Sequence, residues 1–505
     1  MMVLIGEICS GLVECDELGK LSWEEGSVGG GSKIKKGRHL RFHQIEKKNG
    51  RSSKRGCLST KEVNYLTLPM ENGDVDTNNI ANSTVISILD FVKNRRSEDL
   101  LSTSINMVPS GLRDVSPSSY DPRVASIGPL HREDQNVQYF QELKANYVQF
   151  LLDDINSPPE ETLKECVQRV LSLIDRIRAC YMGTSVIHRY DDIELAKMMV
   201  TDACFMLHFI NVITTSSAEL HRTLRGTAIL YDLILLENQI PFFVLQEVFN
   251  CTIPKSLHKV SSLPHLILKF VRFLNIFEST VTFAINLPSP PYDHILGFLA
   301  KCYWPSDTHY SFLLPTSATH STIELDRAGV IFKPNEYDSL QLAIEFKSSR
   351  SLWCSLSREK PTLRMPVLRI DNYTELVLRN IIAYEQYFGN VSYVTGYAMA
   401  MDMLIDSEDD IAKLIESKVI VNHLGSNEKA ANALNSLCKE LPILNFSYEH
   451  QWRDMDAHYN RYWPKNIAEL KRTYFSSPWN LIALLAGIIL FALTVVQTIY
   501  SVNAA

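Results

Sequence analysis

Apolar positions recur at the spacing of α-helices along most of the chain after about residue 103. Leu163, Val167 and Val170 share one side of a helix whose start is predicted by the sequence SPPE at 157–160, with Ser157 as the N-cap. Proline at the first helical position and an acid in the first turn are typical of such starts. The same spacing predicts further helices at about 191–212, 223–238, 241–249, 263–277, 293–303, 372–388, 408–417, 426–439 and 448–475.

Patterns typical of β-strands are short. They occur at 329–333, 343–346 and 367–370, where apolar and β-branched residues are bounded by polar ones. These segments are too few for a β or α/β architecture. The predicted fold is mainly α, a large helical domain with one small β-sheet.

An uncharged apolar segment close to the C-terminus is the strongest single pattern. Pro478 to Tyr500 spans 23 residues without a charged side chain. As a helix it would reach about 34 Å, enough to cross a hydrocarbon core of about 30 Å. Trp479 and Tyr500 stand at its two ends, where aromatic rings favour the membrane interface. A buried core helix is the alternative, but such helices usually have only about 10–14 apolar residues.

Basic residues on one side of this segment predict its orientation. Lys465, Lys471 and Arg472 precede it, whereas the tail after it, SVNAA, is uncharged. Because positively charged flanks stay in the cytosol, the body of the protein is expected there. The sequence therefore predicts a single transmembrane helix that acts as a tail anchor in the plasma membrane or an endomembrane.

The formal net charge of -7 conceals an uneven distribution. Between Lys33 and Arg55 there are ten Lys or Arg residues and one acid, a local charge of +9, so the other residues sum to -16. The surrounding stretch is polar and weakly periodic, which predicts a largely disordered basic arm. This arm could bind anionic lipid, nucleic acid or an import receptor, or remain a solvated tail. We expect no nucleic-acid partner, because Phe42 is the one aromatic residue in the basic block.

Together these features divide the chain into four parts. They are a basic arm at 1–102, a helical domain at 103–475, a transmembrane helix at 478–500 and a short tail at 501–505.

Common catalytic and cofactor motifs are missing from the sequence. It has no Walker A loop, nucleophile elbow, zinc-protease motif, dinucleotide glycine pattern or kinase motif set. Its ten cysteines include no C-x-x-C pair, which favours buried, reduced thiols. Cys204 and His208 are four residues apart and could be two zinc ligands, but a buried thiol and a hydrogen-bonded histidine are the favoured interpretation. We expect no catalytic residue, no cofactor and no bound metal.

Six polar residues stand out within very apolar or helical stretches. They are Asp202, Glu237, Asn238, Gln239, Glu385 and Gln386. Buried polar groups need partners, so each is expected to bond to the backbone or to a counter-ion. For Asp202 the alternatives are a helix cap, a core salt bridge and a catalytic acid, in that order. For 237–239 the backbone groups freed near Pro241 are the expected partners, and a polar site at a helix break is the alternative.

Several segments together resemble one plant family, the "domain of unknown function 247" proteins. In order they are SINMVPSGLRDVSPSSYDPRVASIGPLHRE, MMVTDACFMLHFI, LLENQIPFFVL, ELDRAGVIFK, MPVLRIDNYTELVLRNIIAYEQ, LIDSEDDIAKLIESKVIVNHLGSNE and the C-terminal apolar segment. The likeness covers roughly residues 103–502. Ala125 stands where the family usually has valine, Ala203 replaces a glycine and His208 replaces a glutamate.

The resemblance implies a single-span plant membrane protein without a known catalytic mechanism or cofactor. Some grass members are implicated in self-incompatibility, which would make the fold a recognition module. Our leading hypothesis is a membrane-anchored, non-catalytic protein that binds unknown protein partners. The alternative is an enzyme with an unrecognised site around Asp202, Glu237 and Glu385. An enzyme requires these carboxylates to line one pocket with raised pKa values.

Overall fold

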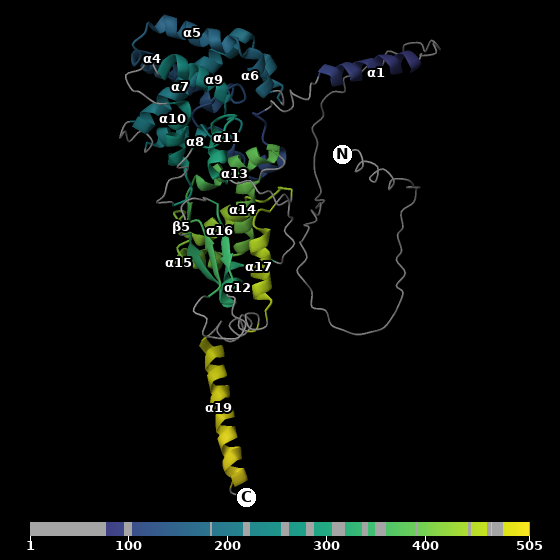
Figure 1. Cartoon of the computed structure of the whole chain (residues 1–505), viewed down its shortest axis with the longest axis vertical. Coiled ribbons are helices and arrows are strands. Elements are labelled where there is room, and N and C mark those ends of the chain that lie inside the picture. Colours follow the sequence, from purple (N-terminus) through teal and green to yellow (C-terminus); the bar gives the residue numbers. More distant parts are fainter. Residues whose placement is uncertain are drawn as a thin grey trace, which may run out of the picture. The chain divides into compact units, whose positions relative to one another are not determined.

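The computed structural model describes most of the chain after residue 76. The described residues are 77–94, 104–181, 184–215, 223–253, 262–278, 287–305, 319–335, 342–348, 360–388, 392–442, 446–461, 466 and 478–503. The mainly α fold predicted from the sequence is confirmed (Figure 1). The basic block at 33–55, and with it most of the predicted arm at 1–102, lies outside the described residues.

One group of helices packs around a long central helix. Its members are α4 (Gln138–Asp153), α5 (Pro159–Leu171), α6 (Ile174–Cys180), α7 (Asp192–Thr215), α8 (Leu224–Asp232), α9 (Phe242–Thr252) and α10 (Leu263–Val271). Helix α7 is the centre, because α4, α5, α9 and α10 all contact it. Its apolar side chains point in every direction, as expected for a helix covered on all sides.

A second group follows in the C-terminal half of the body. It contains α12 (Thr322–Arg327), α13 (Thr374–Glu385), α14 (Tyr393–Leu404), α15 (Glu408–Glu416), α16 (Asn427–Asn435) and α17 (Glu449–Tyr459). Helix α11 (Ile295–Tyr303) joins the two groups, because it contacts α13 and α14 and its Phe298 stacks on Phe242 of α9. Every residue of α13 except Glu375 is buried, which places this helix between its neighbours (Figure 1).

The strands form two small sheets among the described residues. Strands β1 (Ile331–Pro334), β3 (Thr362–Met365) and β2 (Glu345–Lys347) pair in that order, parallel and then antiparallel. Strands β4 (Leu368–Ile370) and β5 (Ile420–Asn422) form a parallel pair. The three predicted strand segments are all present. Strands β3 and β5 were not predicted, because three or four residues are too short to show alternation.

Several predicted helix boundaries are wrong. Helix α10 ends at Val271 instead of 277, α16 at Asn435 instead of 439, and α17 at Tyr459 instead of 475. The helix expected at 223–238 ends at Asp232, because the side chains of Asn238 and Gln239 bond to carbonyl groups at 232–235 and so compete with further helical turns. Helix α5 starts at Pro159, and Ser157 is not its N-cap. Pro158 takes the extended conformation before the first turn and occupies the capping position itself.

Residues 104–137, which precede α4, run through the interior with little regular structure. They contain only α3 (Ser110–Val115) and the 3₁₀ turns η1 (Pro117–Ser119) and η2 (Gln135–Val137). Further 3₁₀ turns are η3 (Val186–Arg189), η6 (Arg272–Leu274) and η7 (Gln386–Phe388). We call residues 104–134 the leading segment. Ile105, Ala125 and Ile127 within it are fully buried, so its backbone must find hydrogen-bond partners in the core.

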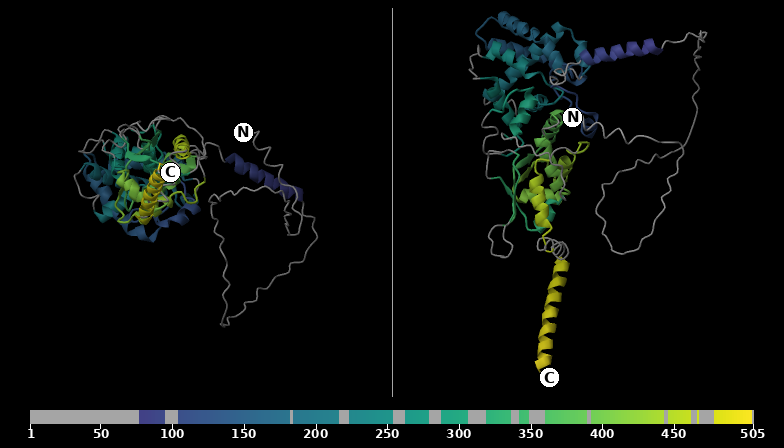
Figure 2. Two further views of the ribbon diagram at one scale, coloured as in Figure 1. Left: turned by 90° about the horizontal axis from the view of Figure 1, so that it is seen from below. Right: turned by 45° about the vertical axis from the view of Figure 1, so that its right-hand side comes forward.

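Two described helices, shown as ribbons in Figure 2, carry several exposed apolar side chains. Helix α19 (Pro478–Asn503) extends three residues beyond the predicted end at Tyr500, and Trp479 at its start is exposed. Between Ile482 and Ile499 it is long and apolar enough to cross a membrane, and none of that window is buried. Helix α1 (Thr77–Asn94) is the other.

Candidate functional site

Acceptor side chains from α8 and from the turn after it bind the backbone of the leading segment. Asp232 accepts three N–H bonds, from Arg123 at 2.9 Å, Val124 at 2.7 Å and Ala125 at 2.8 Å. Burial raises the pKa of Asp232 to about 6, although these N–H bonds favour the charged form. One carboxylate therefore fixes three consecutive backbone amides.

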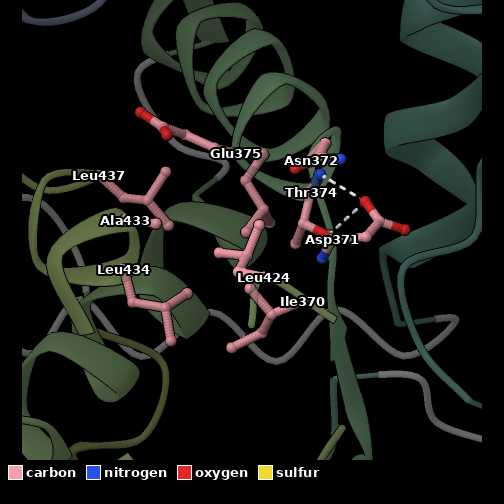
Figure 3. A pocket seen from close by; sticks show the side chains of 10 residues that line it. Ile370, Asp371, Asn372, Thr374, Glu375, Leu424, Ala433, Leu434 and Leu437 are labelled. Atoms are coloured by element: carbon pink, nitrogen blue, oxygen red, sulfur yellow. Dashed lines mark hydrogen bonds between the residues drawn. The ribbon is translucent and has the colours of Figure 1, made fainter. Parts of the chain in front are cut away.

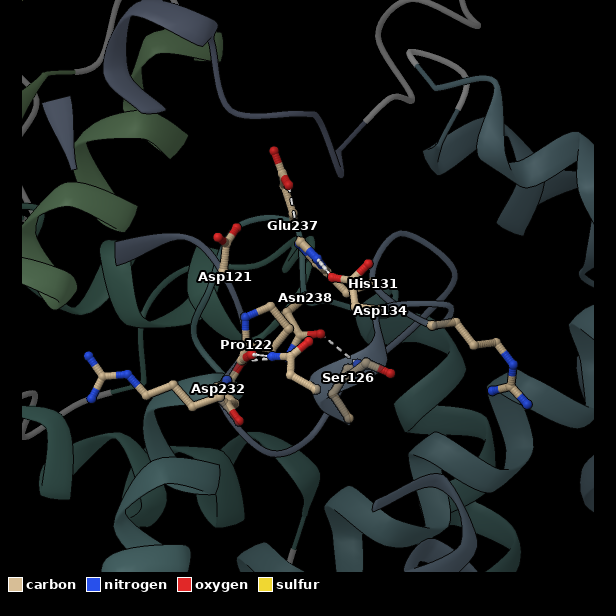
Figure 4. A network of polar contacts seen from close by, with 12 residues as sticks. Asp121, Pro122, Ser126, His131, Asp134, Asp232, Glu237 and Asn238 are labelled. Carbon is tan, nitrogen blue, oxygen red and sulfur yellow. Dashed lines mark hydrogen bonds and ion pairs between the residues drawn. The ribbon is translucent and has the colours of Figure 1, made fainter. Parts of the chain in front are cut away.

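Asn238 binds the leading segment two residues further on, at Ile127. Its Oδ1 accepts the Ile127 N–H at 2.6 Å, and its Nδ2 donates to the carbonyl oxygens of Ala125 and Asp232, each at 2.8 Å. Figure 4 shows Asn238 between Asp232 and the loop that carries Ser126. The side chain is completely buried, and all three bonds go to backbone groups. Asn238 thus ties the leading segment to the end of α8.

Asp202, in the middle of α7, forms a core salt bridge. Its Oδ1 lies 2.5 Å from Nζ of Lys144 on α4, and its Oδ2 accepts the Gly128 N–H at 2.9 Å. Lys144 also donates to the Ser126 carbonyl at 2.5 Å. Burial lowers the pKa of Lys144, against the attraction of Asp202. The salt-bridge alternative for Asp202 is therefore the correct one.

Glu237 contacts the leading segment at three residues. Its Oε1 accepts the Val108 N–H at 2.5 Å, and its Oε2 lies 2.5 Å from Arg113 and 3.2 Å from His131 (Figure 4). Burial alone would raise the pKa of Glu237, but hydrogen bonds from His131 and Arg113 outweigh it and lower the pKa. His131 also contacts Asp134 at 2.7 Å. Burial would lower the pKa of His131, but the bonds to Glu237 and Asp134 raise it.

The side chain of Gln239 bonds only to backbone groups. Its Nε2 donates to the carbonyl oxygens of Leu233 and Leu235, and its Oε1 accepts the Leu296 N–H at 3.2 Å. Its own carbonyl accepts the Tyr181 hydroxyl at 2.7 Å. These bonds fix the irregular turn between α8 and α9, as predicted for the groups freed near a helix break.

Gly128 lies where this turn and the leading segment approach most closely. Its φ is +70°, a conformation that favours glycine. A Cβ atom there would lie 2.7 Å from the Gln239 carbonyl oxygen and 2.9 Å from the Tyr181 hydroxyl. No side chain fits, so the contact needs glycine at this position.

Glu385 and Gln386 belong to a separate network at the end of α13. The carboxylate of Glu385 accepts the N–H groups of Val394 and Thr395, at 2.9 and 2.8 Å, and the Thr395 hydroxyl at 2.7 Å. It therefore caps α14. Burial raises the pKa of Glu385 to about 7. Gln386 donates to the Ile382 carbonyl at 3.2 Å.

Asn380 links α13 to the leading segment and to the turn after α8. Its Oδ1 accepts the Leu236 N–H at 2.9 Å, and its Nδ2 donates to the carbonyl oxygen of Ser119 at 2.8 Å. Arg379, one residue earlier, binds Glu375 at 2.7 Å and the Ser436 hydroxyl at 2.8 Å. These polar groups hold elements together and leave little capacity for a ligand.

A pocket of about 210 Å³ lies between the start of α13 and α16, away from the carboxylates named above (Figure 3). Its walls are largely aliphatic, with Ile370, Leu424 and Leu434 among them. Its two acids already have partners, because Asp371 accepts bonds from Thr374 and Glu375 pairs with Arg379. Asp202, Glu237 and Glu385 do not line it.

Cys204 and His208 do not form a metal site among the described residues. Burial raises the pKa of the Cys204 thiol to about 12 and lowers that of His208. The His208 ring packs against Tyr147 and Phe150, at 5.9 and 5.7 Å between centroids. Both residues thus serve packing in α7.

The structure brings four of the six predicted polar residues together and leaves two apart. Asp202 and 237–239 surround the leading segment, whereas Glu385 caps α14 and Gln386 bonds to a carbonyl of α13. Sequence reasoning missed Asp232, which interrupts the apolar run LYDLILL and could have been found by the criterion that selected Asp202. It also missed Lys144, which is fully buried but stands among polar neighbours that give no signal.

Asp202, Glu237 and Glu385 lie in the segments on which the family resemblance rests. A family model described as "Plant protein of unknown function" matches residues 105–493. The chain belongs to this family, domain of unknown function 247. The match begins within the leading segment, so the network that holds this segment lies inside the family domain.

Two relatives from Arabidopsis thaliana are similar over most of their length. The UPF0481 protein At3g47200 is 26% identical over 418 residues, which cover 79% of this chain and 86% of the relative. The putative UPF0481 protein At3g02645 is 24% identical over 496 residues, covering 79% and 90%. No solved structure matches. The family is one of unknown function, so these names assign no activity to the chain.

Proposed function

We propose that this protein is a non-catalytic recognition module held at a membrane by α19, with its helical body in the cytosol. The observation that carries the proposal is the exposed, uncharged surface of α19. From Ile482 to Ile499 no charged residue occurs, and the apolar side chains have no cover within the protein. Exposing so many apolar side chains to water is unfavourable, whereas a bilayer would cover all of them.

Flanking charge supports a cytosolic body. Lys465, Lys471 and Arg472 precede α19, and the five residues after Tyr500 carry no charge. Because positively charged flanks stay in the cytosol, the helical body that precedes α19 would face the cytosol. The membrane could be the plasma membrane or an endomembrane.

The bonding of the carboxylates supports a non-catalytic role. Glu237 has a lowered pKa and binds two cationic side chains, Asp202 is paired with Lys144, and Glu385 caps a helix. A catalytic acid or base needs a proton-exchanging oxygen that faces a substrate cavity. The raised pKa of Glu385 comes from burial, and its bonds go to the backbone and side chains of its own protein. The enzyme alternative therefore has no convergent site to support it.

Membrane insertion is tested by an alkaline carbonate wash and by a glycosylation reporter. The full-length chain should remain in the pellet after washing, and a reporter sequon fused behind Ala505 should be glycosylated. The exposed sequon at Asn372 provides the matched control, because it should stay unmodified when the body is cytosolic. Release by carbonate would contradict the anchor, and glycosylation of Asn372 would contradict the orientation.

Partner recognition is tested by proximity labelling in plant cells. A labelling enzyme fused to the full chain should mark a set of proteins that the same enzyme fused to α19 alone does not mark. Both fusions carry α19, so proteins that are marked only by the full-chain fusion are those that lie near the helical body. Identical labelled sets would contradict a recognition role.

A further inference from the structure

Helix α1 exposes a row of aliphatic side chains that is separate from the proposed membrane anchor α19. Val85, Ile86, Ile88 and Leu89 are between 49 and 60% exposed. The helix precedes the family domain, which begins at residue 105. Elsewhere in the body, large exposed apolar side chains such as Leu224 are scattered singly along their helices. A contiguous apolar row of this kind is typical of an interaction surface.

Three of these four side chains form one side of the helix. At about 100° per residue, Val85, Ile88 and Leu89 share one face, Ile86 lies about 100° away from Val85, and Ser87 lies on the opposite face. From Thr77 to Leu89 the sequence TNNIANSTVISIL contains no charge. Up to Leu89 the polar groups are therefore small and uncharged, and Asp90 and Lys93, which have opposite charges, follow before the helix ends. Such groups can lie at a lipid headgroup boundary.

We propose that α1 lies in the plane of an anionic membrane surface and forms a second, peripheral membrane contact. The sequence before it carries a charge of +9 between Lys33 and Arg55, which is complementary to an anionic leaflet. The inference rests on the proposed anchoring in one respect. Helix α19 would hold the chain at the bilayer, so binding of α1 would become intramolecular and would need only weak affinity.

Other occupants fit the helix less well. A paired helix from a second copy needs an apolar seam over several heptads, whereas the exposed row covers residues 85–89 among the side chains of α1 that the structure describes. A second transmembrane span is disfavoured by the asparagines at 78, 79 and 82. A bilayer surface needs neither length nor a repeating seam.

The test uses the full chain with insertion of α19 prevented by Leu485→Arg and Leu490→Arg, which we call the span-disabled chain. Its flotation is measured with vesicles of phosphatidylcholine alone and of phosphatidylcholine mixed with phosphatidylserine. We expect binding to the anionic vesicles only, and a decrease as salt is raised. Equal binding to neutral vesicles would overturn the anionic-surface proposal.

Substitutions on opposite faces of α1 locate the contact. Ile88→Glu should lower partitioning about tenfold or more, whereas Ser87→Glu, with the same charge one residue away, should change it by less than about twofold. Ile88→Leu keeps the apolar face and favours the helix, so its binding should match the parent. Equal losses for Ile88→Glu and Ser87→Glu would overturn the assignment. Ile88-dependent dimerisation without vesicle binding would assign the face to a second copy.

The two proposals fail separately. Carbonate release of the wild-type chain would contradict the anchor, while flotation of the span-disabled chain through Ile88 would still establish α1 as a membrane contact. Retention of the wild-type chain, combined with no flotation of the span-disabled chain, would leave the anchor intact and overturn the role of α1.

Discussion

Helices α7 and α19 look alike by length and composition but have opposite surroundings. Among the described helices, these two are long and apolar enough to cross a membrane. In α7, which spans Asp192–Thr215, 72% of the most apolar window is buried inside the protein, whereas none of the window in α19 is buried. Apolar length therefore does not distinguish a core helix from a membrane span.

The two helices differ in where their polar side chains find hydrogen-bond and ion-pair partners. Helix α7 carries Asp202, whose charge is compensated by Lys144 on a neighbouring helix. It also carries His208, which packs against aromatic rings of α4. In α19 the hydroxyl groups of Thr494, Thr498 and Ser501 donate to backbone carbonyls of the same helix. A helix whose polar side chains require partners on other helices is suited to a protein core, whereas a helix that satisfies its own polar groups is suited to lipid.

The largest effect should come from placing charge in α19. In the span-disabled chain each arginine costs about 2.5–3.5 kcal/mol at the centre of a span, so carbonate-resistant membrane association should be lost. Ile193→Arg at an exposed position of α7 is the matched control and should leave association unchanged. Loss of association in the control as well would mean that α7 also contributes to anchoring.

Removing the charge in α7 should instead destabilise the fold. Asp202→Ala leaves Lys144 buried without its counter-ion, which we expect to cost about 3–5 kcal/mol of unfolding free energy. The measurement is urea unfolding of the full chain in detergent. The double change Asp202→Leu with Lys144→Met removes both charges and should recover most of the loss. A mild effect of Asp202→Ala alone would show that the pair is not the polar anchor of α7.

The sequence allowed the prediction of most helices, of the apolar C-terminal helix and of five buried polar residues, Asp202, Glu237, Asn238, Gln239 and Glu385. It did not allow the prediction of partners such as Lys144, because partner choice depends on how distant helices pack. The helix expected to continue beyond Asp232 also shows this limit. The apolar pattern continues to Leu236, but side-chain bonds from Asn238 and Gln239 end the helix, and periodicity contains no information on them.

A smaller loss of unfolding free energy is expected from a substitution where the leading segment meets the turn after α8. Gly128→Ala adds a Cβ 2.7 Å from the Gln239 carbonyl oxygen, in a backbone conformation that disfavours alanine, and should cost about 2–3 kcal/mol. Gly425→Ala is the control, because its φ of +76° is similar and no atom lies within 4 Å of the added Cβ. It should cost about 1 kcal/mol. Equal losses in thermal or urea unfolding would exclude the close contact as the cause.

The smallest effect should be the pH dependence from His131. Because the folded state raises the pKa of His131, its stabilising contribution is complete below the ordinary value of 6.5 and is lost as pH rises through the folded pKa. His131→Gln should remove about 1 kcal/mol at low pH and flatten this part of the stability profile. Unfolding curves measured across this range provide the check. Parallel profiles for wild type and variant would contradict the link to Glu237.

The most direct test of the account is to map which segments a bilayer protects. Membranes containing the full chain are stripped with alkaline carbonate and urea to unfold the body, then digested with protease, and the protected peptides are identified by mass spectrometry. The account predicts a protected peptide from 478–503 and complete digestion of 192–215. Protection of 192–215, or no protected peptide at all, would contradict the claim that α19 crosses the membrane while α7 forms the core.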